Sequence, residues 1–230
     1  MNSKEIISQV TEILKTKWAT RDGKKVPEPE DIELGNDAVQ IDGTVLYADM
    51  MDSTGLVNGY KNWFAAEVYK SYLTAACRVI RNNDGAITAF DGDRVMAVFF
   101  GSVKNTSAAK AALQINFIVN QINLALKAQY PTTAFTLKQT VGVDTSSLFV
   151  AKTGIRNSND LVWVGRAANY AAKLSALGKE NYTSYITEDV FVKLNDSAKY
   201  GDNPRRLMWE KRNWTATGKT IYRSNWWWPF

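Results

Sequence analysis

The stretch TVLYADMMDST, residues Thr44 to Thr54, runs from an apolar segment directly into an acid. Its first half predicts a buried β-strand, and a carboxylate at the end of such a strand is costly unless another group pairs with it. That carboxylate is Asp49, and a second one, Asp52, follows three residues later, just before Ser53. The stretch alone leaves three roles open for Asp49: capping the next helix, pairing with a base, or holding a metal ion.

The residue composition limits the chemistry that the chain can carry out. Its 230 residues include no histidine and a single cysteine, Cys77. Histidine triads, imidazole zinc sites and Cys–His dyads are therefore excluded. Any metal must be a hard cation on oxygen ligands, with Mg²⁺ or Mn²⁺ the first choices. The lone cysteine fits a reducing compartment, so we expect a cytoplasmic protein.

Charge and hydropathy limit the partners that the chain can have. The net charge of +5, from 28 Lys and Arg against 23 Asp and Glu, is not concentrated in one basic block. Nucleic-acid binding is therefore not indicated, and a phosphate-rich small ligand fits equally well. Because no apolar run reaches the roughly 18 residues that span a bilayer, we expect no membrane span.

The order of the predicted elements indicates the fold class. Residues 1–35 are predicted to form an amphipathic helix and a Pro-rich linker, and residues 36–230 one α/β (α+β) domain. The order β-α-β-β-α-β, followed by a C-terminal extension, is that of the ferredoxin-like arrangement. The predicted elements are strand 44–49, helix 60–82, a hairpin of strands 86–90 and 94–100, helix 105–128, strands 135–145 and 161–165, helix 166–177, a strand near 185, a helix from 188 and a last hairpin at 207–211 and 220–223.

Two acids are expected to meet at one edge of this sheet. The first strand lies beside the hairpin in this topology, so Asp49 at the strand end and Asp93 after the hairpin turn converge. Two close carboxylates repel each other unless a cation lies between them or one is protonated. With no histidine available, a divalent metal ion is the favoured explanation. The alternative is that each acid only serves a turn or a helix cap.

Two further segments carry groups suited to phosphate chemistry. The turn after Asp49 leads into a helix and directs the backbone N–H groups around Ser53 and Thr54 at one place, an arrangement that binds anions. The alternative is that one of these hydroxyls only caps the helix. Farther along the chain, Asn169 and Lys173 lie four residues apart and share a helix face. On spacing alone, the simpler explanation of this pair is a solvated helix face.

Four segments in this order resemble the class III nucleotidyl cyclases. VLYADMMDST (45–54) resembles the family's first metal-binding strand, and AFDGDRVMAVF (89–99) resembles the hairpin whose Gly-Asp supplies the second metal ligand. TVGVDTSSLFVAKTG (140–154) is similar to the strand pair that follows, and VGRAANYAAKL (164–174) is similar to the helix after that pair. Each segment alone is a weak match, but together they cover residues 44–177 with order and spacing preserved.

The resemblance implies how a reaction would be catalysed. Asp49 and Asp93 would hold two divalent cations, Mn²⁺ or Mg²⁺, with the Met50 carbonyl as a further ligand. Asn169 would orient the ribose, and Lys173 stands where the family has the Arg that stabilises the transferring phosphate. The products would be a 3′,5′-cyclic nucleotide and pyrophosphate. In family enzymes the metal acids of one protomer face the Asn and Arg of the other, so a head-to-tail homodimer with shared active sites is expected.

The positions that read the base depart from the family pattern. Adenylate cyclases of this class carry Lys at the position of Ala89 and Asp or Thr at that of Val162, and the guanine-reading Glu and Cys are missing there too. Because buried hydrogen-bonding groups give large base discrimination, this pocket has lost the known purine readers. Lys173 keeps the charge of the Arg that it replaces but loses the bidentate fork. Asp52 stands where family members often have Gly.

These departures make the chain similar to the pyrimidine cyclases of bacterial antiphage (Pycsar) systems. That resemblance implies a substrate of UTP, favoured over CTP, and a cyclic UMP or cyclic CMP product that activates a separate cyclic-nucleotide-binding effector. Phe90, Asp91 and Arg94 are the candidates for shaping or reading the base. The alternatives are an adenylate or guanylate cyclase with unusual base contacts, and a catalytically inactive cyclase-homology module that binds nucleotide.

The C-terminal segment SNWWWPF (224–230) belongs to none of these motifs. Aromatic tails of this kind pack over a dimer or a sheet edge, or anchor a protein at a membrane interface. We expect packing.

Overall fold

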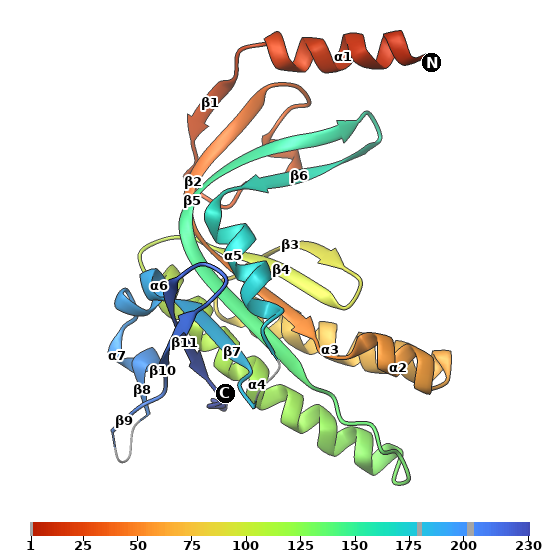
Figure 1. Ribbon diagram of the computed structural model, residues 1–230, viewed down its shortest axis with the longest axis vertical. Coiled ribbons are helices and arrows are strands. Elements are labelled where there is room, and N and C mark those ends of the chain that lie inside the picture. The colour runs from red at the N-terminus through yellow and green to blue at the C-terminus, as the bar shows by residue number, and fades with distance from the viewer. Residues whose placement is uncertain (1, 179–180, 202–204) are drawn as a thin grey trace.

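The apolar stretch that ends in Asp49 forms the second half of a long strand, β2 (Asp37–Met50), in the computed structural model, which describes residues 2–178, 181–201 and 205–230. β2 lies inside a sheet of strand order β10-β11-β7-β5-β2-β4-β3, with β1 paired to β2 and β6 paired to β5 (Figure 1). The elements are α1 Ser3–Lys15, β1 Ala19–Asp22, a 3-10 turn Pro29–Asp31, β2 Asp37–Met50, α2 Ser53–Gly59, α3 Asn62–Asn82, β3 Ala86–Asp91, β4 Arg94–Phe99, α4 Lys104–Gln129, β5 Gln139–Ile155, β6 Ser158–Val164, α5 Arg166–Ser175, β7 Ser184–Thr187, α6 Glu188–Val192, α7 Asp196–Lys199, β8 Tyr200–Gly201, β9 Arg206–Leu207, β10 Glu210–Trp214 and β11 Lys219–Ser224. The order of β2, α3, β3, β4, α4 and β5 confirms the ferredoxin-like fold class.

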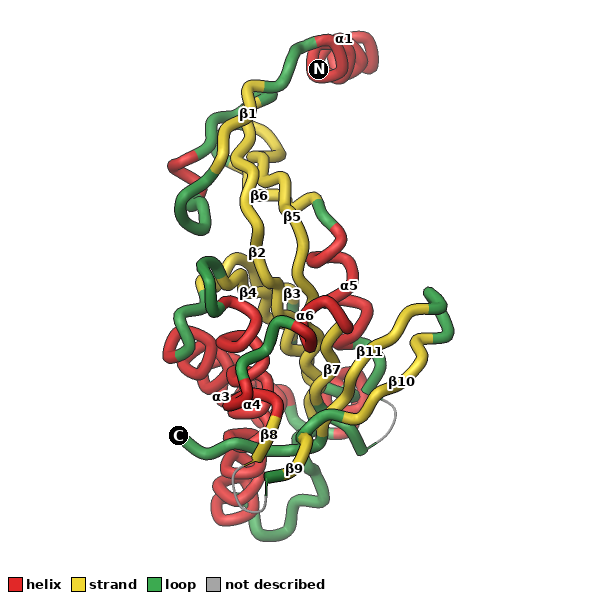
Figure 2. Tube along the Cα trace, turned by 90° about the vertical axis from the view of Figure 1, so that its left-hand side faces the viewer, coloured by secondary structure: helices red, strands yellow, loops and turns green. Residues whose placement is uncertain are grey.

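Helices cover the two faces of the sheet. Leu46 and Met50 of β2 pack in one apolar cluster with buried residues of α3 and α4, whereas Val45 packs in another cluster with Ala167 of α5. Figure 2 shows α3 and α4 on one side of the strands and α5 on the other. Because side chains alternate along a strand, Asp49 lies on the α5 side of the sheet.

Part of the sheet extends beyond these helices as an arm, formed by the first half of β2, the end of β5, β6 and β1 (Figure 1). β6 pairs with β5 as a hairpin, and β1 runs parallel to β2 from Ala19 opposite Asp37. The segment between α1 and β2, which was predicted to be a linker, therefore contains the strand β1. At the end of the arm lies α1, whose apolar side chains are all exposed: Ile6, Ile7, Val10, Ile13 and Leu14.

The long helices agree closely with their predicted bounds. α3 covers 62–82 and α4 covers 104–129, against predictions of 60–82 and 105–128. The short helix α2, at 53–59, was not predicted as a separate element. In the part of the chain that the structure describes, no helix combines the length and apolar character needed to cross a bilayer.

The C-terminal aromatic residues pack along α4. Phe117 of α4 stacks on Trp227 with 5.8 Å between ring centroids, and it meets Phe230 edge-on. The backbone N–H of Trp228 donates to the backbone carbonyl of Leu113 at 3.1 Å, and the Trp228 ring packs against the main core. The tail packs as predicted, but on a helix of its own chain rather than over a sheet edge.

We expect Trp228→Ala to lower the free energy of unfolding by about 2 kcal/mol, because it removes a ring that packs against the core. Trp227→Ala is the matched control: its side chain is 55% exposed, and we expect a loss of about 1 kcal/mol or less. Urea unfolding followed by tryptophan fluorescence measures both. Equal effects of the two substitutions would contradict this account of the tail.

Candidate active site

Asp49 and Asp93 lie at neighbouring strand ends on one edge of the sheet. Asp49 is opposite Arg94 in the pairing of β2 with β4, and Asp93 lies in the turn that joins β3 to β4. Gly92 in that turn has a φ of +62°, a left-handed conformation that glycine adopts readily. Burial, and then the nearby charge of Asp93, raise the pKa of Asp49 to about 6. The structure therefore brings together the two acids that the topology predicted to converge.

The donors at this edge fit a hard divalent cation. A cation relieves the repulsion between the carboxylates of Asp49 and Asp93. Met50 is only 3% exposed and its side chain packs in the core, so only its backbone can face the acids. Among the described residues there is no cluster of three or more His, Cys, Asp or Glu able to enclose a metal. Mg²⁺ needs no such cage, because it is usually bound by one or two carboxylates, water and substrate phosphates.

The hairpin of β3 and β4 also carries the predicted base contacts. Phe90 is 59% exposed at the end of β3. The next residue, Asp91, forms an ion pair with Arg94 across the turn. Arg94 is partly buried and opposite Asp49 in the strand pairing, and its positive charge acts on the Asp49 carboxylate.

Tyr47 is a residue of this edge that was not singled out from the sequence. It is opposite Met96 in β4, and Met96 is opposite Ala89 in β3, so the three residues form one row across the sheet and pack in one cluster. Alternation along β2 could have indicated it, because a side chain two residues before Asp49 shares its face. Val162, the other predicted base-reading position, lies elsewhere, on β6 in the arm, and is 39% exposed.

The start of α2 is capped by Asp52. Its backbone is left-handed, with φ 57° and ψ 37°, and its carboxylate accepts a hydrogen bond from the Gly55 N–H at 3.2 Å. The cap is therefore Asp52 rather than Ser53 or Thr54. Of these two, Ser53 is partly buried and Thr54 is exposed. The Asp52 carboxylate already occupies the position at which the N-terminus of α2 favours an anion.

Asn169 and Lys173 lie on the solvent side of α5. The helix packs on the sheet through Ala167 and Ala171, which are both fully buried, and residues two positions away point in the opposite direction. Both polar side chains are exposed, and neither has a hydrogen bond or ion pair to any residue that the structure describes. Asp49 lies on the face of the sheet that α5 packs against. Within one chain, Asn169 and Lys173 therefore point away from the sheet surface that carries Asp49.

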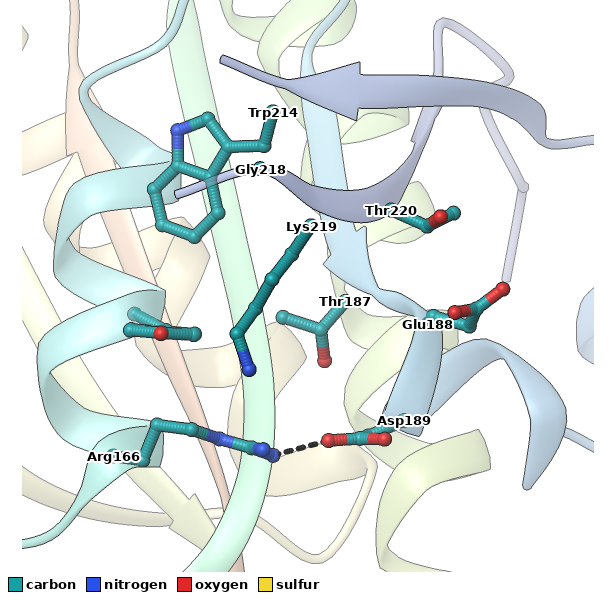
Figure 3. A pocket seen from close by; sticks show the side chains of 9 residues that line it. Arg166, Thr187, Glu188, Asp189, Trp214, Gly218, Lys219 and Thr220 are labelled. Carbon is teal, nitrogen blue, oxygen red and sulfur yellow. Dashed lines mark ion pairs between the residues drawn. The ribbon is translucent and has the colours of Figure 1, made fainter. Parts of the chain in front are cut away.

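A cavity of about 320 Å³ opens between α5 and the C-terminal extension (Figure 3). Arg166 and Tyr170 of α5 line one side, and Asp189 of α6 and Lys219 of β11 line the other. Figure 3 shows the Arg166 guanidinium directed at the Asp189 carboxylate, with which it forms an ion pair. These residues were not singled out from the sequence, because ion pairs between distant segments leave no periodic pattern in it.

Comparison with known proteins places the chain in a family, although no family model matches it. A uridylate cyclase of Xanthomonas perforans is 52% identical over 227 residues, which are 97% of this chain and 96% of the relative. A uridylate cyclase of Burkholderia cepacia is 47% identical over 221 residues, 95% of each chain.

The solved structures that resemble the chain are more distant in sequence. The adenylyl cyclase CyaB from P. aeruginosa aligns with a TM-score of 0.70 at 18% identity, over 81% of this chain and 95% of that one. A dimeric guanylyl cyclase domain from the aquatic fungus Blastocladiella emersonii aligns with a TM-score of 0.63 at 11% identity, over 80% and 97%. At these identities the likeness shows the fold alone, which is that of class III cyclase catalytic domains. The identities of 47% and 52% over nearly the whole length show more: the chain belongs to the uridylate cyclase family and is a nucleotidyl cyclase.

Proposed function

We propose that the protein converts UTP to 3′,5′-cyclic UMP and pyrophosphate, with CTP the less favoured substrate. One geometric observation carries the reaction: the convergence of Asp49 and Asp93 at neighbouring strand ends. The choice of UTP rests on the relatives named uridylate cyclase and on the absence of the purine readers at Ala89 and Val162.

The two acids would hold two divalent cations, Mn²⁺ or Mg²⁺, with the Met50 carbonyl as a further ligand. When bound, such ions neutralise a triphosphate and lower the pKa of a hydroxyl nucleophile. The carboxylates are suited to this role because a pKa of about 6 leaves Asp49 mostly ionised at neutral pH despite its neighbour. The remaining catalytic groups then have to come from α5.

Asn169 would orient the ribose and Lys173 would stabilise the charge that develops on the transferring phosphate. Both side chains are exposed and directed away from the sheet surface that carries Asp49. We therefore place them against the metal acids of a second copy, in a head-to-tail homodimer with two shared active sites. The exposure of Asn169 and Lys173, on the face of α5 opposite the alanines that contact the sheet, supports this dimer.

The remaining predicted contacts are assigned to the substrate. Phe90, Asp91 and Arg94 would shape or read the pyrimidine, because they lie on the hairpin beside the metal acids. Ser53 and Thr54 would contact the triphosphate through their N–H groups once it displaces the Asp52 carboxylate from the cap of α2. The product would act in the cytoplasm as a second messenger for antiphage defence, on a separate cyclic-nucleotide-binding effector.

Incubation of the purified protein with Mn²⁺ and each of the four NTPs tests the substrate. We expect cyclic UMP to exceed every other product by at least about tenfold, since Ala89 and Val162 offer no hydrogen bond to a purine and the relatives are named uridylate cyclase. Asp93→Ala should abolish the product. Dominance of cyclic AMP or cyclic GMP would overturn the pyrimidine assignment, and no product from any NTP would favour the inactive nucleotide-binding module.

The burial of Asp49, together with the nearby charge of Asp93, predicts a pH-dependent effect of Asp49→Asn on the stability of the metal-free protein. The pKa of Asp49 rises from 3.8 to about 6 on folding, so the native state loses stability as the pH rises through this range and keeps the loss above it. At pH 7.5 the free energy of unfolding of Asp49→Asn should exceed that of the wild type by about 1 kcal/mol. This value is reduced for the solvent screening of a half-buried group. The difference should disappear near pH 4. Thermal unfolding across this pH range measures it.

Mn²⁺ should make the wild type more stable than Asp49→Asn at pH 7.5. The wild type should gain stability with Mn²⁺ concentration, and Asp49→Asn should gain little. Asp42→Asn is the control, because Asp42 lies on the same strand, is exposed and pairs with Lys104 away from the acids. A wild type that Mn²⁺ does not stabilise, or a control that behaves like Asp49→Asn, would contradict the assignment of the metal ligands.

Mixing two impaired variants tests the shared active site. Asp49→Ala should be inactive alone and Lys173→Ala should keep only about 1% of the wild-type activity, because each removes one half of both sites. In an equimolar mixture that exchanges freely, half of the dimers contain one intact site, so about a quarter of the wild-type activity should return. Activity that stays at the level of the separate variants after exchange, shown by subunit-exchange fluorescence, would exclude sites built from two chains.

A further inference from the structure

Arg166, the first residue of α5, joins three segments that are distant in the sequence. Its Nε donates to the Asp144 carboxylate of β5 at 3.0 Å, and its Nη2 donates to the Thr145 carbonyl at 2.7 Å. The same Nη2 forms an ion pair with Asp189 of α6 at 2.5 Å (Figure 3). The guanidinium fork therefore fixes the start of α5 to the sheet and to the C-terminal extension at once.

The carboxylate at the centre of this network is fully buried. Asp144 is 0% exposed, and besides Arg166 it accepts a hydrogen bond from the Thr187 hydroxyl at 2.5 Å. A buried carboxylate is tolerated only when its oxygens are paired, so its position dictates where the guanidinium must lie. Ser146 adds a further bond, because its Oγ accepts the Ala167 N–H at 3.0 Å.

The first turns of α5 pack on the sheet through small residues, whereas its last turn packs through the buried Leu174 in a cluster with Trp214 and Ile221. Ala167 and Ala171 meet the sheet, and β5 has Gly142 below them. A Cβ at Gly142 would lie 2.1 Å from the Ala171 carbonyl oxygen, so helix and strand backbones are in close contact there. Small residues allow this approach but interlock little, so the Arg166 fork is the directional contact at the first turn of α5, at the opposite end from the apolar contact of Leu174.

We propose that Arg166, held between Asp144 and Asp189, is a positioning residue that sets the orientation of α5 and thereby aligns Asn169 and Lys173 for catalysis. The inference rests on the proposed roles of those two residues in cyclisation. It assigns a task to the C-terminal extension, because Asp189 of α6 is one of the two anchors of the fork.

The size of the effect follows from helix geometry. Lys173 is seven residues from Arg166, about 10 Å along the helix axis at 1.5 Å per residue, so a small tilt or rotation at the start is carried to it. A misplacement of about 1 Å at a reacting group costs on the order of 100-fold in rate. Loss of one anchor should lower kcat about 5- to 20-fold. KM should change less than about threefold, because Lys173 would act mainly on the transition state.

Asp189→Asn is the first variant to measure, since its carboxylate is more than half exposed and its removal leaves the buried Asp144 pair intact. Glu188→Gln is the matched control: it removes the neighbouring acid of α6, which pairs with Lys211 at 3.7 Å and not with Arg166. With UTP and Mn²⁺ we expect kcat to fall in Asp189→Asn and to stay unchanged in Glu188→Gln. Equal kcat values for the two variants would overturn the proposal.

A double-mutant cycle separates positioning from a general structural loss. If Asp189 acts through α5, Asp189→Asn should lower the rate of a Lys173→Ala enzyme by a smaller factor than it lowers the rate of the wild type, because one of the two groups to be aligned is already gone. The same loss in both backgrounds would overturn the positioning role. Arg166→Lys should lose most of the kcat in the wild-type background, since an ammonium cannot bridge both carboxylates as the fork does.

Failure of the proposed reaction gives a different result from failure of this inference. If the wild type forms no cyclic nucleotide from any NTP, the proposed conversion of UTP to cyclic UMP fails. The anchoring of α5 can then still be measured by amide hydrogen exchange of residues 166–175. We expect exchange at least about tenfold faster in Asp189→Asn than in the wild type or Glu188→Gln. Unchanged exchange would show that Arg166 does not hold the helix.

Discussion

Repulsion between the carboxylates of Asp49 and Asp93 is the constraint on which the active edge depends. The pairing of β2 with β4 brings the two acids together, and burial of the Asp49 carboxylate, followed by the nearby charge of Asp93, raises the pKa of Asp49 to about 6. In a sheet built only for stability, one acid would be replaced by a neutral residue. Their juxtaposition is explained when a divalent cation belongs between them, and the absence of histidine leaves carboxylates as the available charged ligands.

The second constraint is that only one face of α5, the face that carries its alanines, can pack on the sheet. Its alanines have to contact the sheet, so Asn169 and Lys173 have to face solvent, whereas Asp49 lies at the sheet surface on the inner side of the helix layer. The proposed reaction, which uses both groups at one phosphate, therefore takes one of them from another copy. The exposed apolar face of α1 at the end of the arm shows further surface that this chain leaves uncovered.

The predictable parts of the fold and the site are those that local patterns encode. Helical periodicity gave α3 and α4 nearly to the residue, and the Asp-Gly-Asp turn gave the hairpin that places Asp93. The arm was not predicted, because residues 37–43 mix polar and apolar positions and their pairing with β5 is long-range. Ser53 or Thr54 was considered as a helix cap only as the alternative to phosphate binding, because hydroxyls are common caps, whereas a left-handed backbone at Asp52 gives its carboxylate that role. The Arg166 network joins segments that no spacing rule connects.

The roles of the two basic residues of α5, Arg166 and Lys173, are connected. A guanidinium at position 173 would align itself on a phosphate through two parallel bonds, and would correct a small error in the position of its helix. Lys173 is a point charge on a flexible stem and gives no such alignment, so its position depends more strongly on where the helix lies. The fork that this chain lacks at 173 is present at the start of the same helix, where Arg166 binds one buried and one exposed carboxylate. In the proposed role of Lys173 at the phosphate, loss of directional bonding thus makes firm anchoring of α5 more important than it would be in a cyclase that has arginine there.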